Sequence, residues 1–585
     1  MKRAMGFRLC AAAIGMGLLV GAPAAAQEQD QTGRIIDRIV EGEQQLLTRM
    51  HSMHPVLETY IQEFASSGAA SSILRDHYLL GRLTIADRAA VETITASASF
   101  QKSGRNQSSQ PTGNQARDYA ISEGSRSKSA FSWVPAGWAQ MVIPDGNSFN
   151  RSMYDFAYSR KEFLGEVRCL VFDVSPHDKK AQGRFLGTIW VEDQGFRIVR
   201  FNGIYTGSKS SQIFFHFDSW RVNVSSDLWV PAFVYIEEMN ASQKPPESDL
   251  RVLGLGLGKK SPEARFKAQT RLWGYQNVRN GKLDELSDVR IESTAPVVDN
   301  SGSRDVTPVE SQRLWERQAE QNVIQRLERG SLLAPQGEVD QVLNTVVNNL
   351  RATNNLDLDV RCRVLLTTRF ETFSIGKTIV ISRGLLDVLP DEATLAAVLA
   401  EELSHLVLGH RTATSYAFGD QVMFNDGDLV RRLHLTLSPQ EMDAAAAKAI
   451  QLLANSPYSG KLGNAGLFLK ALQSRVQSLP NLVLANLGNQ FASESNIRQL
   501  EELAQKAPPL EENKIDQVAA LPLGSRIKLD VWTNQISLVK AEAVTFVSTR
   551  EKMPFEVTPV ALYLTRLPIK NGGASGSPEI PHGER

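Results

Sequence analysis

The sequence has few cysteines, no net charge and no long apolar run in its interior. Only three of its 585 residues are cysteines, which excludes a small fold held together by a disulfide framework. Lysine plus arginine number 64, as do aspartate plus glutamate, so the formal net charge is zero. This balance argues against a nucleic-acid-binding protein, which needs clustered basic residues. Hydrophobic residues make up 42% of the chain, enough for ordinary cores, and the length indicates roughly three or four domains.

The first 26 residues have the three parts of a secretory signal peptide. Basic residues (Lys2, Arg3 and Arg8) precede an apolar segment (9–21), and 23–26 offers a small-residue cleavage site. The apolar segment is shorter than the roughly 20 residues of a membrane span, and no later segment is apolar enough to be one. We expect cleavage and export to the periplasm or the extracellular space, with no transmembrane segment afterwards. The mature chain then keeps 61 basic and 64 acidic residues, a net charge of −3.

Two cysteines, Cys169 and Cys362, remain after cleavage. They are far apart in the sequence and fall in different predicted domains. We expect two buried free thiols, although a disulfide in an oxidising compartment stays open at this point.

Periodicity and composition predict an α+β multidomain protein. Apolar residues from Ile35 to Met50 recur at helical spacing, whereas aromatic and β-branched runs between 155 and 280 alternate with turn residues. The predicted parts are a signal peptide (1–26), a helical N-terminal segment (27–94), a flexible loop (95–130), an antiparallel β-rich domain (131–280), a linker (281–306), a mainly helical domain (307–510), a C-terminal β-region (511–568) and a disordered tail (569–585).

Within the β-rich domain, residues 187–201 read as a hairpin. The pattern is similar to that of the lipoprotein-carrier half-barrel proteins of bacterial envelopes, and this resemblance implies a β-domain that binds an apolar ligand. A β-domain that simply packs on its neighbour is the favoured alternative. Five aromatic residues either line a groove or belong to the core: Trp190, Phe214, Phe215, Trp220 and Trp229.

The segment 391–410 carries the most specific chemical signal. It opens with the acidic pair Asp391 and Glu392, as helix N-termini often do, and continues with an apolar stripe. Glu401 and His405 are four residues apart and therefore project from one face of the helix, with Glu402 beside them. Zinc peptidases use this spacing for two metal ligands and place a general-base carboxylate directly after the first ligand.

The segment resembles the active-site helix of the peptidase family M48 zinc metallopeptidases. That helix reads Leu-Ala-Ala-Val-Leu-Ala-His-Glu-x-x-His-x-x-x-Gly-His, and this chain has Leu395-Ala-Ala-Val-Leu-Ala-Glu401-Glu402-Leu-Ser-His405-Leu-Val-Leu-Gly409-His410. The upstream segment 378–386 is similar to the edge strand of the family and the start of its next helix. The likeness extends over about 335–460.

The resemblance implies a mainly helical, zincin-like metallopeptidase domain with a small edge sheet. It also implies a zinc metalloendopeptidase that acts on envelope or misfolded polypeptides. In this sequence Glu402 matches the general base and His405 the second zinc ligand, while Glu441 matches the third ligand.

Two positions depart from the family pattern. Glu401 stands where the family has its first zinc histidine, and Ala445 stands where it has a second-motif aspartate. A one-residue shift of the alignment would put Met442 at the third-ligand position, and Asp443 is a further oxygen donor. Three interpretations stay open: a working zinc peptidase that uses Glu401 as a carboxylate ligand, a weak or different metal site, and a metal-free pseudo-peptidase that binds polypeptide as an envelope scaffold.

His410 is a possible extra ligand. Five residues along a helix place it about 140° from His405, so it could share a metal only if the helix ended at Gly409 and the chain turned. We expect instead that His410 caps the helix or packs on a neighbouring helix.

Overall fold

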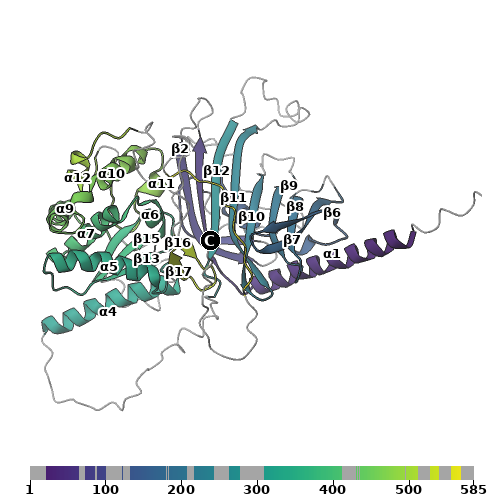
Figure 1. Cartoon of the computed structure of the whole chain (residues 1–585), viewed down its shortest axis with the longest axis horizontal. Helices are drawn as coiled ribbons and strands as arrows, with labels where there is room; N and C mark the ends of the chain where they lie inside the picture. The colour runs from purple at the N-terminus through teal and green to yellow at the C-terminus, as the bar shows by residue number, and fades with distance from the viewer. Residues whose placement is uncertain are drawn as a thin grey trace, which may run out of the picture.

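Figure 1 shows the computed structural model of the chain. The structure describes residues 22–64, 73–85, 89–100, 121–122, 132–178, 181, 183–206, 216–242, 263–276, 308–411, 430, 433, 435–493, 496–511, 527–538 and 555–567. Most of the predicted signal peptide (1–26) and of the loop at 95–130 therefore lies outside the described residues, as do the predicted linker (281–306) and tail (569–585).

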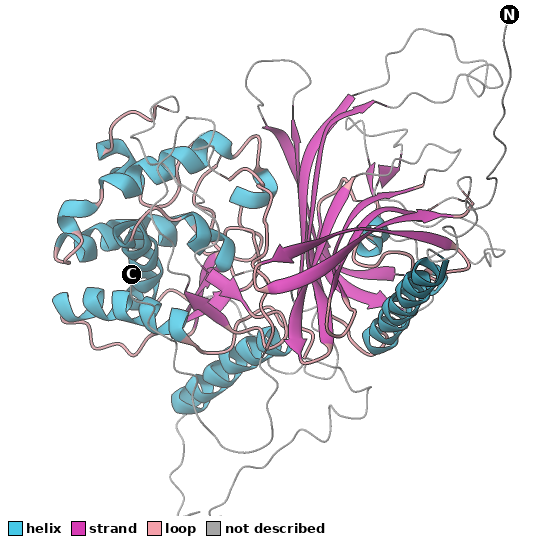
Figure 2. Ribbon diagram, turned by 45° about the vertical axis from the view of Figure 1, so that its right-hand side comes forward, coloured by secondary structure: helices cyan, strands magenta, loops and turns pink. Residues whose placement is uncertain are grey.

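A ten-stranded antiparallel sheet forms the centre of the molecule. Its spatial order is β3-β2-β1-β12-β11-β10-β9-β8-β7-β6, and Figure 2 shows how strongly it twists. The strands are β1 (Val56–Phe64), β2 (Ile73–Ile85), β3 (Ala89–Ala96), β6 (Tyr154–Leu164), β7 (Val167–Pro176), β8 (Phe185–Glu192), β9 (Ile198–Tyr205), β10 (Phe217–Ser225), β11 (Leu228–Ser242) and β12 (Glu263–Trp273). The predicted hairpin at 187–201 is part of β8 and β9, which pair antiparallel.

The predicted helical segment 27–94 is correct only as far as Met50, about a third of its length. Helix α1 (Ala22–Met50) buries Ile39, Leu46 and Met50, but the helical spacing of apolar residues stops there. β1, β2 and β3 instead lie between residues 56 and 96. They belong to the large sheet, although the β-rich domain was predicted to begin only at residue 131. β1 is buried along almost its whole length, so it lacks the polar alternation that identifies a half-exposed strand.

A second part of the chain, residues 308–511, is called here the helical region. Its helices are α4 (Pro308–Arg329), α5 (Glu338–Thr353), α6 (Arg383–Val388), α7 (Glu392–Leu408), α9 (Pro439–Ala454), α10 (Gly463–Arg475), α11 (Pro480–Val483) and α12 (Glu501–Lys506). They surround a small sheet in the order β13-β15-β14, formed by Arg361–Leu365, Thr378–Ser382 and Thr372–Ile375. Figure 1 places this region on one side of the large sheet and α1 on the other.

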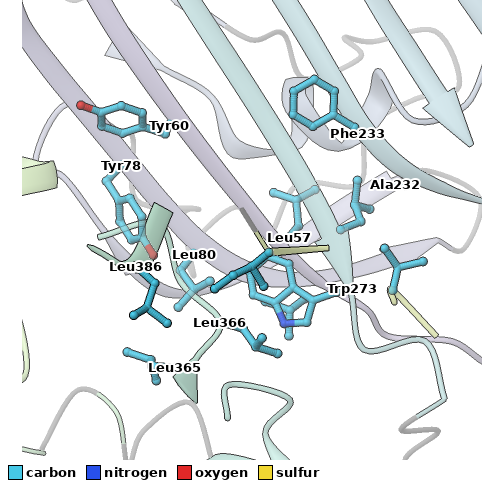
Figure 3. Close-up of a cluster of buried hydrophobic side chains, with 14 of the residues drawn as sticks. Leu57, Tyr60, Tyr78, Leu80, Ala232, Phe233, Trp273, Leu365, Leu366 and Leu386 are labelled. Carbon is cyan, nitrogen blue, oxygen red and sulfur yellow. The ribbon is translucent and has the colours of Figure 1, made fainter. Parts of the chain in front are cut away.

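Buried carboxylates and a shared apolar cluster join the helical region to the large sheet. Glu58 on β1 accepts hydrogen bonds from the backbone N–H of Thr368 at 2.7 Å and from its hydroxyl at 2.6 Å. Figure 3 shows the apolar cluster at this junction, with Leu57 and Leu80 from the sheet close to Leu386 from the helical region. The two parts therefore share one core.

The remaining described elements are short. They comprise β4 (Ile121–Ser122), β5 (Ser132–Trp133), α2 (Pro135–Gln140), a 3₁₀ turn (Gly146–Ser148), another (Ser459–Lys461), β16 (Ile527–Leu529) and β17 (Ile536–Leu538). Within the predicted C-terminal β-region, only β16 and β17 are described as strands, and 555–567 runs across the large sheet without joining it. Cys169 and Cys362 are buried free thiols, as predicted. None of the described helices combines the length and hydropathy needed to cross a bilayer.

Candidate functional site

Helix α7 carries the predicted site and begins and ends where the sequence predicts. Asp391 is its N-cap and accepts a hydrogen bond from the Thr394 backbone N–H at 2.8 Å. Gly409 ends it in the left-handed conformation with φ of 76°, which glycine adopts without strain. The helix is packed between α9, α5 and the small sheet, so its central turns are buried.

Two carboxyl groups lie side by side in this buried setting. Glu401 and Glu402 are each 1% exposed, and among the described residues no hydrogen bond reaches either oxygen of Glu401. Burial, reinforced by repulsion from Glu402, raises the pKa of Glu401 well above its usual range. Burial also raises the pKa of Glu402 to about 7, although the nearby hydroxyls of Thr372 and Ser374 on β14 act in the opposite direction. Burial therefore favours the protonated, neutral form of Glu401.

His405 faces His410 rather than a carboxylate. The two Nδ1 atoms are 2.9 Å apart, so one ring donates and the other accepts. Burial, followed by the second imidazole, lowers the pKa of His405 to about 4, which keeps it neutral. Its Nε2 atom is buried and makes no hydrogen bond to the described residues.

The expectation that His410 would cap the helix is correct for its backbone, whereas its ring packs on His405 of the same helix and not on a neighbouring helix. The chain turns at Gly409, and the His410 backbone N–H donates to the His405 carbonyl oxygen at 2.9 Å. The turn brings the His410 ring back to His405, with the ring centroids 5.2 Å apart. A glycine directly after a helical pattern is the sequence signal for such a turn.

Glu441 is held by the start of its own helix. Its carboxylate oxygen Oε2 accepts hydrogen bonds from the Ser438 backbone N–H at 2.9 Å and from the Ser438 hydroxyl at 2.7 Å. The two residues form a capping box at the N-terminus of α9. The Ser438 hydrogen bonds lower the pKa of Glu441, and the two histidines lower it further. Met442 is buried, and Asp443 is exposed.

A family comparison covers this part of the chain. Residues 335–456 match the model of peptidase family M48. This segment is a peptidase family M48-like region. It holds α5, the small sheet, α6, α7 and α9, and therefore includes every residue of the predicted site.

Other comparisons give weaker likenesses or none. No curated protein matches the chain in sequence. A LolA superfamily protein from Nitrosomonas europaea is 13% identical with a TM-score of 0.21, covering 41% of this chain and 91% of its own. A DUF1329 family protein from Desulfovibrio piger is 11% identical with a TM-score of 0.17, covering 40% and 91%.

The side chains of the M48-like region do not fit a zinc ion as they stand. Within the described residues, no group of three His, Cys, Asp or Glu side chains is placed to hold a metal. The structure brings Glu401, Glu402 and His405 together on α7. The Glu441 carboxylate, in contrast, accepts hydrogen bonds from Ser438. The sequence interpretation missed Ser438, although Ser-x-x-Glu is a known capping signature. It also missed Thr372 and Ser374, for which the sequence carries no signal.

Proposed function

We propose that this protein is an exported, catalytically inactive pseudo-peptidase whose M48-like region serves as a polypeptide-binding scaffold. One observation carries the proposal: the Glu441 carboxylate, expected as the third zinc ligand, caps its own helix through Ser438. Glu401 also supports the proposal, because its carboxyl group stands where the family has the imidazole of its first zinc ligand.

Proton affinity further supports an inactive site. Zinc binds deprotonated ligands, so binding at Glu401 would require the loss of a proton that burial favours keeping. Once ionised, two adjacent buried carboxylates would also repel each other. A zinc site built from these residues would therefore be weak at neutral pH.

Export and polypeptide binding are supported by different observations. The basic, apolar and small-residue segments in 1–26 support export to the periplasm or the extracellular space. The family match supports a polypeptide as the bound molecule. An apolar ligand of the β-domain has less support, because Trp190, Trp220 and Trp229 are all buried as core residues.

The second candidate is a zinc metalloendopeptidase with Glu402 as general base and His405, Glu441 and Glu401 as ligands. Its support is that Glu402 is buried with a pKa of about 7 and that His405 Nε2 has no hydrogen bond within the described residues. Those two groups have the chemistry that a general base and a metal ligand need.

Zinc content and proteolysis of the purified mature chain distinguish the two candidates. We expect well below one zinc per chain and no cleavage of unfolded, fluorescently labelled casein. Glu401→His restores the family's first ligand and should raise zinc content, whereas the matched Glu401→Gln should not. One tightly bound zinc in the wild type, lost on Glu441→Ala, would overturn the pseudo-peptidase proposal.

A further inference from the structure

Residues 555–567, called here the strap, lie in an extended path against the large sheet. Polar contacts hold the strap at its two ends, whereas most residues between them are exposed, including Val560 at 37% and Tyr563 at 71%. An element attached at its ends and loose in the middle can open without unfolding the sheet beneath it.

The first end of the strap is a tripeptide held at the junction of the large sheet and the helical region. The side-chain amide of Gln62 on β1 donates to the Phe555 carbonyl oxygen at 2.6 Å. The same side chain accepts from the Val557 backbone N–H at 2.8 Å. Gln62 is fully buried and holds the backbone on both sides of Glu556, where Phe555 has the left-handed conformation with φ of 70°.

Two further contacts involve the side chains of this tripeptide. Lys267 on β12 forms an ion pair with Glu556. The ring of Phe370, from the helical region, packs edge-on against Phe555 with the ring centroids 5.4 Å apart. Val557 is itself 5% exposed. The site therefore selects an aromatic, an acidic and an aliphatic residue in that order.

The second end of the strap is held by turns at the far end of the sheet. The Leu564 carbonyl oxygen accepts from the Glu166 backbone N–H at 2.9 Å. Arg566 pairs with the buried carboxylate of Glu192 at 2.6 Å. Gly165 faces this part of the strap, where a Cβ atom would lie only 2.6 Å from the Leu564 backbone, so this turn leaves room for the strap only because it lacks a side chain.

We propose that Gln62, Lys267 and Phe370 form a peptide-binding site that the strap occupies within its own chain. When the strap leaves, the site takes a polypeptide segment with an aromatic–acidic–aliphatic triplet from a partner, in the conformation that residues 555–557 now have. This site is separate from α7, so the proposal is independent of whether the M48-like region binds metal.

Tethering explains why a free peptide would bind the wild-type chain poorly. A strap attached to the same chain competes at an effective concentration of the order of millimolar. Weakening the strap at Glu556 should therefore expose the site, because the ion pair with Lys267 is lost while Gln62 and Phe370 stay in place.

The test uses the full-length chain and a labelled peptide with the sequence of residues 553–567, followed by fluorescence anisotropy. Glu556→Lys in the chain should strengthen binding of the wild-type peptide at least tenfold. Thr558→Lys is the control, since it places a lysine at an exposed strap residue two positions away, and should leave binding at the wild-type level. Adding Lys267→Glu to Glu556→Lys restores an ion pair within the chain and should abolish the gain.

Equal affinity of the peptide for the Glu556→Lys chain and the wild type would overturn the proposal. Hydrogen exchange on the unaltered chain provides a second test that does not depend on the folding of a variant. The Val557 amide should exchange by local opening, at least tenfold faster than amides in the centre of β1. If the Val557 amide and the β1 amides both exchanged only through global unfolding, the strap would be a permanent part of the fold and the proposal would be wrong.

Discussion

At the scale of single residues, Glu402 is a buried acid whose proton affinity depends on folding. Its pKa is about 7 in the folded protein against a usual value of 4.5. Between these two pH values the folded state binds more protons than the unfolded state. The free energy of unfolding therefore falls as the pH rises through this window, and the loss is complete above about pH 7.

Replacing Glu402 by glutamine should remove this dependence while keeping the shape of the side chain. We expect Glu402→Gln to raise the free energy of unfolding at pH 8 by about 1–3 kcal/mol relative to the wild type, with a smaller difference at pH 4.5. Urea denaturation at several pH values measures both. Asp443→Asn, which changes an exposed carboxylate on α9, should leave the pH profile unaltered. A Glu402→Gln profile parallel to that of the wild type would contradict the argument.

At the scale of elements, a buried ion pair attaches α1 to the large sheet. Both guanidinium Nη atoms of Arg221 on β10 donate to the Glu43 carboxylate at 2.7 Å. The side chains are 2% and 1% exposed. An exposed pair on the same helix, Arg49 with Asp227 at 2.8 Å, provides a comparison within one interface.

Removing one partner of the buried pair should be costly. Glu43→Ala leaves the Arg221 charge buried without its carboxylate and should lower the free energy of unfolding by about 3–5 kcal/mol. Arg49→Ala should change it by less than about 1 kcal/mol, because water already solvates that pair. Chemical denaturation of both variants measures the difference. Equal effects would contradict the argument that burial makes the loss of one partner more costly.

At the scale of the whole molecule, Asp76 on β2 ties the sheet to the helical region. Its carboxylate accepts from the backbone N–H groups of Asn481 at 3.0 Å and Leu482 at 2.9 Å. Glu58 and the cluster in Figure 3 join the same two parts, and we therefore expect the sheet and the helical region to unfold together.

Calorimetry can test that cooperativity. We expect the wild type to unfold in one transition and Asp76→Ala to unfold in two, since the variant leaves buried N–H groups at 481 and 482 unpaired. Glu92→Ala, at an exposed position of β3, is the control and should keep a single transition. A single transition at an unchanged Tm in Asp76→Ala would show that Asp76 does not couple the two parts.

Much of the fold could be predicted because its signals are local. The helix at 391–409 was expected from its acidic first turn and apolar stripe, and α7 spans Glu392–Leu408. The strands β7 to β9 were expected from their aromatic and β-branched content. The place of β1 could not be predicted, because its partner β12 is more than two hundred residues away and no local pattern encodes that pairing.

The candidate site was predictable where one helix carries it. The spacing alone puts Glu401 and His405 on one face of α7. The orientation of Glu441 depends instead on competition between a metal and the nearby Ser438 hydroxyl, which the search for ligands did not weigh. Likewise, the contact of His410 with His405 depends on a single left-handed residue, Gly409.

The pairing of β1 with β12 also has a consequence for how the molecule acquires its structure. The buried hydroxyls of Thr59 and Thr270 meet at 2.9 Å across a separation of 211 residues. β1 can pair early with β2, its neighbour along the chain, but its other edge stays open until β12 arrives. Closing so long a loop slows folding and leaves an unsatisfied strand edge exposed to other chains. We therefore expect slow refolding whose yield falls as the protein concentration rises.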